Sequence, residues 1–164
     1  MLTLEEVAKQ SRKQRFKRLE RPADDFAAAI TGRDDAELSG RPDAKNWAAK
    51  EVVCHIRDAE ELFLECLKAM ISRDEPEFGQ PDHGDRWAEE RQYLRNDTSD
   101  ALSVFRKHRA ATLTFVRARV LGDWDRGGSF GGLGRMTVDY LLAVMAWHDD
   151  NHLDQLKRAL EGRA

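Results

Sequence analysis

The amino-acid sequence predicts an all-α domain built as a four-helix bundle. Four segments carry apolar residues at the three- and four-residue spacing of amphipathic helices. Only 4 of the 164 residues are proline, and most of the 11 glycines gather in one stretch, so little interrupts these segments. A chain of this length can bury a core of its own. We therefore expect a single domain over residues 1–164, with an extra helical segment at its N-terminus.

The first segment is predicted to be helical but broken. Residues 2–20 alternate charged and apolar side chains at loose helical spacing, and Pro22 then breaks or restarts the helix. The apolar stripe continues to Ile30. Residues 32–46 are rich in turn formers and are predicted to be a loop with one short helical turn. The apolar anchors of the first segment are Leu4, Val7, Phe16 and Leu19. They need a surface to cover beyond the four-helix core, which is weak support for a homodimer.

The second predicted helix, residues 47–72, has the most regular apolar stripe. Glu51 stands where the glutamate of a capping box would stand, but Ala48 has no hydroxyl group, so we expect an incomplete cap. The stripe consists of Val52, Ile56, Ala59, Phe63, Leu67 and Met70.

A long crossover and the third helix follow. Residues 73–97 contain two prolines, two glycines and many charges, which predicts a crossover with a helical turn over residues 86–94. Residues 98–120 are predicted to form the third helix, capped by Thr98 or Ser99. Its apolar face consists of Leu102, Phe105, Leu113, Val116 and Val120.

The glycine-rich stretch 122–135 is predicted to be a flexible turn that leads into the fourth helix, residues 138–161. The stretch lacks the pattern of a phosphate-binding loop, because no GxxxxGK[ST] motif and no third glycine of GxGxxG is present. Thr137 is expected to cap the fourth helix. The apolar stripe of that helix is Val138, Leu141, Met145, His148, His152, Leu156 or Gln155, and Ala159.

The connection lengths predict an up-down-down-up order. An antiparallel hairpin of two helices does not need a connection as long as residues 73–97. The crossover can run the length of the bundle and leave the second and third helices parallel. The second and fourth helices are then antiparallel.

Charge and cysteine usage exclude several classes of protein. The 27 Lys and Arg residues against 30 Asp and Glu residues give a net charge of −3, which argues against a nucleic-acid or membrane-surface binder. No apolar run is long enough for a signal peptide or a membrane span. Cys54 and Cys66 lie too far apart on one helix to form a disulfide. We expect a cytoplasmic protein with reduced thiols.

The chemistry is expected at histidines that lie within or beside the apolar stripes. His148 and His152 are four residues apart on one helical face, which suits two ligands of a single ion. His55 lies on the second helix at a similar height along the antiparallel pair. Polar rings that face a core need partners. Three imidazoles with an open fourth position are typical of a catalytic metal site.

Two carboxylates flank His55 by one helical turn on either side. Asp58 and Glu51 are candidates to orient a ligand imidazole by hydrogen bonding or to polarise bound water; the alternative is an ordinary charged helix face. The adjacent pair Asp149-Asp150 is expected to face solvent. His83 and His108 continue no apolar stripe and are expected at the surface, and Cys54 is expected to be packed rather than nucleophilic.

The spacing of these residues resembles the DinB superfamily of DinB/YfiT-like metalloenzymes. A block around His55 is followed far downstream by a His-Asp-x2-His-Leu-x-Gln block, and Ala48 departs from the serine that the family usually has after its tryptophan. The residues that carry the resemblance are Trp47, Glu51, Val52, His55, Ile56, Asp58, Glu60, Asp123, Trp124, Arg126, Gly134, Thr137, Val138, His148, Asp149, His152, Leu153 and Gln155.

The resemblance implies a four-helix bundle of up-down-down-up order, usually dimeric, with His55, His148 and His152 as metal ligands. It implies either a metal-dependent hydrolase or a transferase that uses a low-molecular-weight thiol, acting on a small molecule. Zinc or nickel is expected, since imidazole suits either ion. The alternative is a non-enzymatic dimeric scaffold or stress-response binding protein whose metal is structural or lost.

Overall fold

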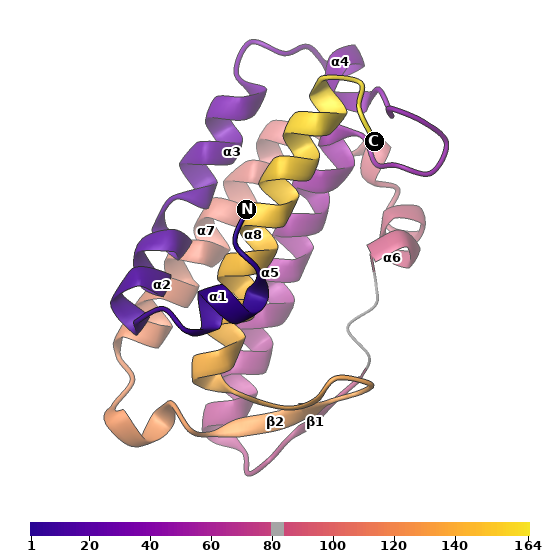
Figure 1. Ribbon diagram of the computed structural model, residues 1–164. Helices are drawn as coiled ribbons and strands as arrows, with labels where there is room; N and C mark the ends of the chain where they lie inside the picture. Colours follow the sequence, from indigo (N-terminus) through magenta and orange to yellow (C-terminus); the bar gives the residue numbers. More distant parts are fainter. Residues whose placement is uncertain (80–83) are drawn as a thin grey trace.

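The computed structural model describes residues 1–79 and 84–164, and it shows the expected four-helix bundle (Figure 1). The first bundle helix is divided into α2 (Arg12–Glu20) and α3 (Pro22–Ile30). The other three bundle helices are α5 (Ala49–Ser72), α7 (Thr98–Arg117) and α8 (Val138–Leu160). Followed along the chain, α3 rises, α5 and α7 both descend and α8 rises again, which confirms the up-down-down-up order.

The N-terminal region forms two short helices where the sequence suggested one loosely helical segment. α1 (Leu4–Ala8) and α2 each begin at a capping box, made by Thr3 with Glu6 and by Ser11 with Gln14. Because a second helix N-terminus is capped only eight residues after the first, the segment forms two helices instead of one. α1 lies across α8 in Figure 1.

The apolar residues of this region are covered by the chain itself. Val7 and Leu19 are fully buried, and Leu4 and Phe16 are partly buried against the same core cluster. The sequence suggested that these side chains need a surface beyond the four-helix core, as weak support for a dimer. The structure removes that argument, because α1 and α2 cover the bundle with them.

Capping contacts set the start of the long helices. The Ala48 N–H donates to the Glu51 carboxylate at 2.9 Å. Only this one of the two capping-box hydrogen bonds forms, as expected from the missing hydroxyl group of Ala48. Asp97, rather than Thr98 or Ser99, caps α7, because its carboxylate accepts from the Asp100 N–H at 2.8 Å.

The last predicted helix begins as expected, and the shorter elements fill the connections. Thr137 caps α8 by accepting from the Tyr140 N–H at 3.0 Å. α4 (Asp35–Ser39) supplies the short helical turn expected before α5, while α6 (Gly84–Glu90) and the 3-10 turn η1 (Tyr93–Arg95) lie in the crossover. Val120 was assigned to the apolar face of the third helix, but α7 ends earlier and Val120 is exposed.

The glycine-rich stretch forms a β-hairpin, so the prediction of a flexible turn was wrong. After the 3-10 turn η2 (Leu121–Asp123), β2 (Gly127–Phe130) pairs antiparallel with β3 (Gly134–Thr137) and parallel with β1 (Glu77–Phe78). A Cβ on Gly128 would lie 2.6 Å from both the Phe78 ring and the Pro76 carbonyl oxygen. Glycine here permits close strand packing rather than flexibility.

The core of the bundle has two clusters, and the histidine pair of α8 lies where they adjoin. One cluster contains Phe26, Ile56, Phe105 and Leu156, and the other contains Leu67, Leu141, Met145 and Trp124. His55 directly precedes Ile56 of the first cluster, while His148 follows Met145 of the second by three residues. Within residues 1–79 and 84–164, no helix combines the length and apolarity that crossing a membrane requires.

Candidate metal centre

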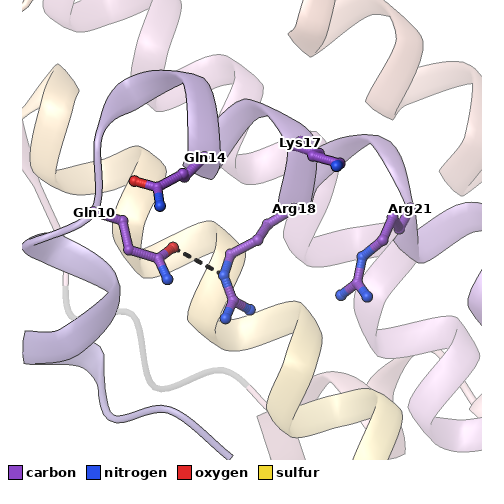
Figure 2. Close-up of a pocket in the computed structure, with 5 residues that line it drawn as sticks. All are labelled: Gln10, Gln14, Lys17, Arg18 and Arg21. Carbon is purple, nitrogen blue, oxygen red and sulfur yellow. Dashed lines mark hydrogen bonds between the residues drawn. The ribbon is translucent and has the colours of Figure 1, made fainter.

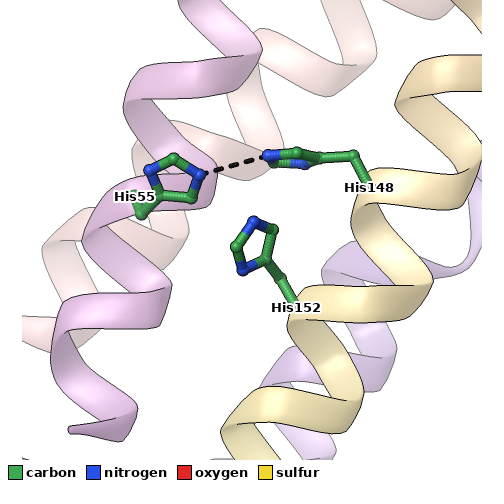
Figure 3. Close-up of side chains that lie close together, drawn as sticks. All are labelled: His55, His148 and His152. Atoms are coloured by element: carbon green, nitrogen blue, oxygen red, sulfur yellow. Dashed lines mark hydrogen bonds between the residues drawn. The ribbon is translucent and has the colours of Figure 1, made fainter. Parts of the chain in front are cut away.

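Three histidine side chains converge between α5 and α8. His55 projects from α5, and His148 and His152 project from successive turns of α8 toward the same point (Figure 3). The Nε2 atoms of His55 and His148 are 3.1 Å apart. One ring nitrogen from each of the three residues lies within 4.8 Å of the others, and all three side chains are partly buried. The structure therefore brings together the three residues that the sequence singled out.

The spacing of the nitrogens suits a tetrahedral ion. With bonds of about 2.0–2.1 Å from zinc to imidazole nitrogen, two ligand atoms of a tetrahedral site lie roughly 3.3 Å apart. The 3.1 Å between His55 and His148 is close to that value. The Nδ1 atom of His55 is buried and accepts or donates no hydrogen bond within the described part of the chain. The donor set fits a divalent ion that takes nitrogen ligands.

Two neighbouring side chains, those of Gln155 and Trp47, contact the His152 ring. Its Nδ1 lies 2.7 Å from the Gln155 amide oxygen, which leaves Nε2 for the centre of the site. The Trp47 ring stacks on His152 with an interplanar angle of 13° and a centroid distance of 6.4 Å. The Trp47 indole N–H in turn donates to Asp85 at 3.0 Å. Both Trp47 and Gln155 belong to the sequence pattern that resembles the DinB superfamily.

Burial keeps the imidazoles in the form that binds metal. Burial, reinforced by the neighbouring histidines, lowers the pKa of His55 from 6.5 to about 2. The pKa of His152 falls to about 3, mainly by burial and then by the proximity of His148, although the Gln155 contact opposes the shift. A ligating imidazole must be neutral. These two histidines are therefore ready to accept a metal ion across the neutral pH range.

Among the described residues, the hydrogen-bond partners found for Asp58 and Glu51 are groups other than the three histidines. Asp58 accepts from Arg57 at 2.7 Å and from the Tyr93 hydroxyl at 2.8 Å, and it also pairs with Arg91. Glu51 accepts from Arg41 at 2.7 Å as well as from the helix N-terminus. These hydrogen bonds hold both carboxylates beside α5, and their role in orienting an imidazole or polarising bound water stays a prediction.

Asp149 is buried, so the prediction that it faces solvent was wrong. It is 3% exposed and accepts from Arg109 at 2.7 Å, while the same guanidinium donates to Glu60 at 2.6 Å. Burial would raise the pKa of Asp149, but the charge and hydrogen bond of Arg109, together with the neighbouring His148, outweigh burial and lower that pKa. Burial would likewise lower the pKa of Arg109, yet Asp149 and Glu60 raise it. We call Glu60, Arg109 and Asp149 the buried charge triad.

The position of Arg109 in the sequence indicates that its side chain is buried. Arg109 follows Phe105 by four residues and precedes Leu113 by four, so it stands inside the apolar stripe of α7. A charge in that position needs a buried partner. Asp150, by contrast, is partly buried and pairs with Arg18 and Arg21 of the N-terminal helices.

The remaining candidates lie away from the centre. His108 is partly buried with a buried Nδ1, so its expected surface position was only partly right. His83 lies outside the described residues. Cys54 is buried, and burial raises its thiol pKa to about 11, as expected of a packed rather than nucleophilic cysteine.

An apolar pocket of about 160 Å³ adjoins the histidines. His55 and His148 form part of its wall, and α5, the β-hairpin and α8 supply most of the rest. The Phe63 ring meets His148 edge-on at a centroid distance of 5.4 Å. The other lining residues are Ala59, Leu62, Trp87, Phe130, Leu133, Met136, Leu141 and Val144.

A second hollow, of about 300 Å³, lies on the N-terminal helices and is lined by long side chains with polar or charged ends (Figure 2). Its walls are Gln10, Gln14, Lys17, Arg18 and Arg21. The Arg18 guanidinium donates to Gln10 at 3.0 Å, and both arginines pair with Asp150. These ion pairs fasten the N-terminal helices to α8, so this hollow is explained by the fold.

Comparison with known protein families decides the classification. The family model of the DinB superfamily matches residues 18–156, which includes all three histidines and the buried charge triad. The chain belongs to the DinB superfamily. No curated protein sequence matches the chain in the corresponding comparison.

The fold of this chain is similar to that of a solved structure. YfiT from Bacillus subtilis superposes with a TM-score of 0.84 over 95% of this chain and 92% of the YfiT chain, at 18% sequence identity. That structure is described as "a probable metal-dependent hydrolase with an unusual four-helix bundle topology". At this level of identity the likeness establishes the shared bundle fold.

Proposed function

We propose that this protein is a metal-dependent hydrolase whose divalent ion is held by His55, His148 and His152. The observation that carries the proposal is the convergence of the three ring nitrogens, from two antiparallel helices, to within 4.8 Å of one another. The description of YfiT as a metal-dependent hydrolase supports the same reaction class. Family membership adds to this support, because the matched region contains all three ligands.

A divalent ion at this site would polarise an electrophilic carbonyl and activate water for attack on it. Three imidazoles leave one tetrahedral position for water or substrate, whereas structural zinc sites generally use four protein ligands. We propose zinc or nickel, both of which accept imidazole nitrogen. The adjoining pocket gives a substrate access to His55 and His148.

The surrounding residues hold the ligands in place. Gln155 fixes the His152 tautomer with the proton on Nδ1, and the Trp47 ring lies nearly parallel to the His152 ring at a centroid distance of 6.4 Å. The buried charge triad carries one positive and two negative groups. Its net negative charge contributes an electrostatic potential that favours a cation, since Asp149 directly follows His148 in α8.

Metal content and hydrolysis, measured on matched histidine variants, test the proposal. The wild-type protein loaded with zinc or nickel is assayed against neutral esters and amides with a free low-molecular-weight thiol absent or present. We expect hydrolysis without thiol. His148→Ala should lose both the ion and the activity, while His108→Ala, which alters a histidine of α7 outside the cluster, should keep both.

Three outcomes contradict the proposal. Turnover that requires the thiol and yields a thioether or thioester assigns the protein to the thiol-dependent transferases. An ion that raises the melting temperature but supports no reaction favours the non-enzymatic scaffold. Unchanged metal content in His148→Ala removes the site altogether.

A further inference from the structure

The walls of the pocket beside His55 and His148 determine which substrates can reach them. Among residues 1–79 and 84–164, no charged side chain lines this pocket, and the polar groups there are those of the two histidines and the Trp87 indole. A carboxylate or phosphate placed among Leu62, Phe63 and Val144 would lose its hydration without gaining an ionic partner. Burying an unpaired charge in this way is costly. The pocket therefore excludes charged groups and accepts apolar ones.

The size of the pocket limits the apolar group. A cavity of about 150 Å³ lined by Leu, Ile and Phe stays dry and holds one benzene molecule. The pocket here has a volume of about 160 Å³ and a similar lining, with Phe63 and Phe130 among its aromatic side chains. A group of about six carbons, such as a phenyl ring or a branched or linear alkyl chain, fills that volume.

The placement of the histidines orients such a group. His55 and His148 form part of the same wall as Ala59 and Phe63, so an apolar group in the pocket brings the atoms attached to it to the histidine nitrogens. Leu133, which is 58% exposed, lies at the turn of the β-hairpin and also lines the pocket. The pocket is therefore open to solvent at the hairpin turn.

We propose that the pocket is the acyl-group subsite of this protein, specific for uncharged acyl groups with an apolar portion of about six carbons. That the bound group is an acyl group depends on the proposed hydrolase function. That the pocket binds an apolar group depends on the pocket alone. Substrates of this class are neutral esters or amides of aromatic or medium-chain acids. Hydrolysis adds water across the acyl bond and releases the acid and an alcohol or amine.

Toluene binding tests the subsite independently of catalysis. Because a bound ion could hold a sulfonate, toluene is titrated by calorimetry or NMR into the metal-free protein, in which the pocket alone determines binding. Benzenesulfonate is measured alongside. We expect toluene to bind at least tenfold more tightly than benzenesulfonate. Val144→Phe, which fills the pocket, should weaken toluene binding at least tenfold, and Val104→Phe, on the exposed face of α7, should leave it unchanged.

A second variant keeps the test decisive if Val144→Phe does not fold. Leu133→Ala removes apolar contact from a mostly exposed position and should weaken toluene binding severalfold. No toluene binding to the wild type, equal binding of benzenesulfonate, or binding that neither folded variant changes would overturn the assignment.

Ester hydrolysis separates this inference from the proposed function. With nitrophenyl esters of increasing acyl length, kcat/KM should rise from acetate to hexanoate and fall for much longer chains. Toluene binding without hydrolysis of any ester would contradict the hydrolase and leave the apolar subsite supported. Hydrolysis without dependence on acyl length, together with no toluene binding, would contradict the subsite and support the hydrolase.

Discussion

Arg109 is the residue whose replacement should cost the fold most. Arg109→Met leaves Glu60 and Asp149 buried without a positive partner, and removing one member of a buried ion pair typically costs about 3–5 kcal/mol. Arg106→Met is the matched control, since Arg106 lies on the same helix and pairs with Asp24 at the surface. Its replacement should change the free energy of unfolding by roughly 0–1 kcal/mol. Urea denaturation of both variants measures the difference, and equal costs would contradict a structural role for the triad.

Gln155 should control metal affinity without binding the ion. Gln155→Leu removes the acceptor for His152 Nδ1 and should weaken metal binding by roughly 10–100-fold, as loss of a hydrogen bond to a ligand imidazole generally does. Asp154→Asn alters the neighbouring exposed residue and should leave the affinity unchanged. Competition with a chelator of known affinity gives both dissociation constants. A metal affinity in Gln155→Leu equal to that of the wild type would show that the contact has no part in ligand positioning.

At the scale of single residues, the sequence predicted the ligands better than their surroundings. His148 and His152 were recognisable from four-residue spacing within an apolar stripe, and His55 from its height on the antiparallel helix. Asp149 was placed in solvent because an adjacent acidic pair is typical of a helix surface. Its partner Arg109 is 40 positions away in the chain, so only tertiary packing reveals the pair.

The β-hairpin is the element that depends most on glycine. Gly128→Ala would bring a Cβ to 2.6 Å from the Phe78 ring and the Pro76 carbonyl oxygen. Such overpacking typically costs about 1–3 kcal/mol and should displace β1, with a loss of order around Phe130 and Met136 in the pocket wall. Gly122→Ala, where nothing lies within 4 Å of the added atom, should be nearly neutral. Thermal unfolding compares the two, and a neutral Gly128→Ala would mean that the strands can separate without strain.

At the scale of elements, long helices were predictable and short strands were not. The predicted range 47–72 differs from α5 (Ala49–Ser72) by two residues at one end, because a regular apolar stripe extends over many turns. The hairpin strands have four residues each and contain three glycines, so they show no apolar alternation and only one β-branched side chain, that of Thr137. One of them, β2, also pairs with β1, whose position far earlier in the sequence gives no local sign of that pairing.

The stability of the whole molecule without metal should depend on pH through its histidines. Because the pKa values of His55 and His152 in the fold, about 2 and 3, lie below the ordinary 6.5, the unfolded chain binds more protons between these limits. The free energy of unfolding should therefore be highest above pH 6.5 and fall as the solution is acidified, by about 1.4 kcal/mol per pH unit for each histidine.

Urea denaturation of the metal-free protein between pH 7 and pH 5 measures this dependence. In that window ordinary carboxylates remain ionised, so histidines account for most of the slope. His152→Gln removes one titrating group and should reduce the slope accordingly. A stability that does not change over this range would contradict the burial of neutral imidazoles.

We also propose that the protein is a homodimer, an expectation that comes from the family resemblance. Light scattering at micromolar concentration should give twice the chain mass of 18.8 kDa. Since the N-terminal apolar residues are used within the bundle, a dimer would need another surface. A mass equal to that of one chain would contradict the proposal and leave the metal centre, which lies within a single chain, unaffected.

X-ray absorption spectroscopy of the zinc-loaded protein tests the central claim most directly, because it reports the atoms around the ion. The account predicts three imidazole nitrogens at about 2.0–2.1 Å, with the remaining position taken by oxygen. Bound zinc, and with it the imidazole signal, should be lost in His148→Ala and persist in His108→Ala. Sulfur scattering at about 2.3 Å, which would place the ion at Cys54 or Cys66, or fewer than three imidazoles in the wild type, would contradict the assignment of His55, His148 and His152.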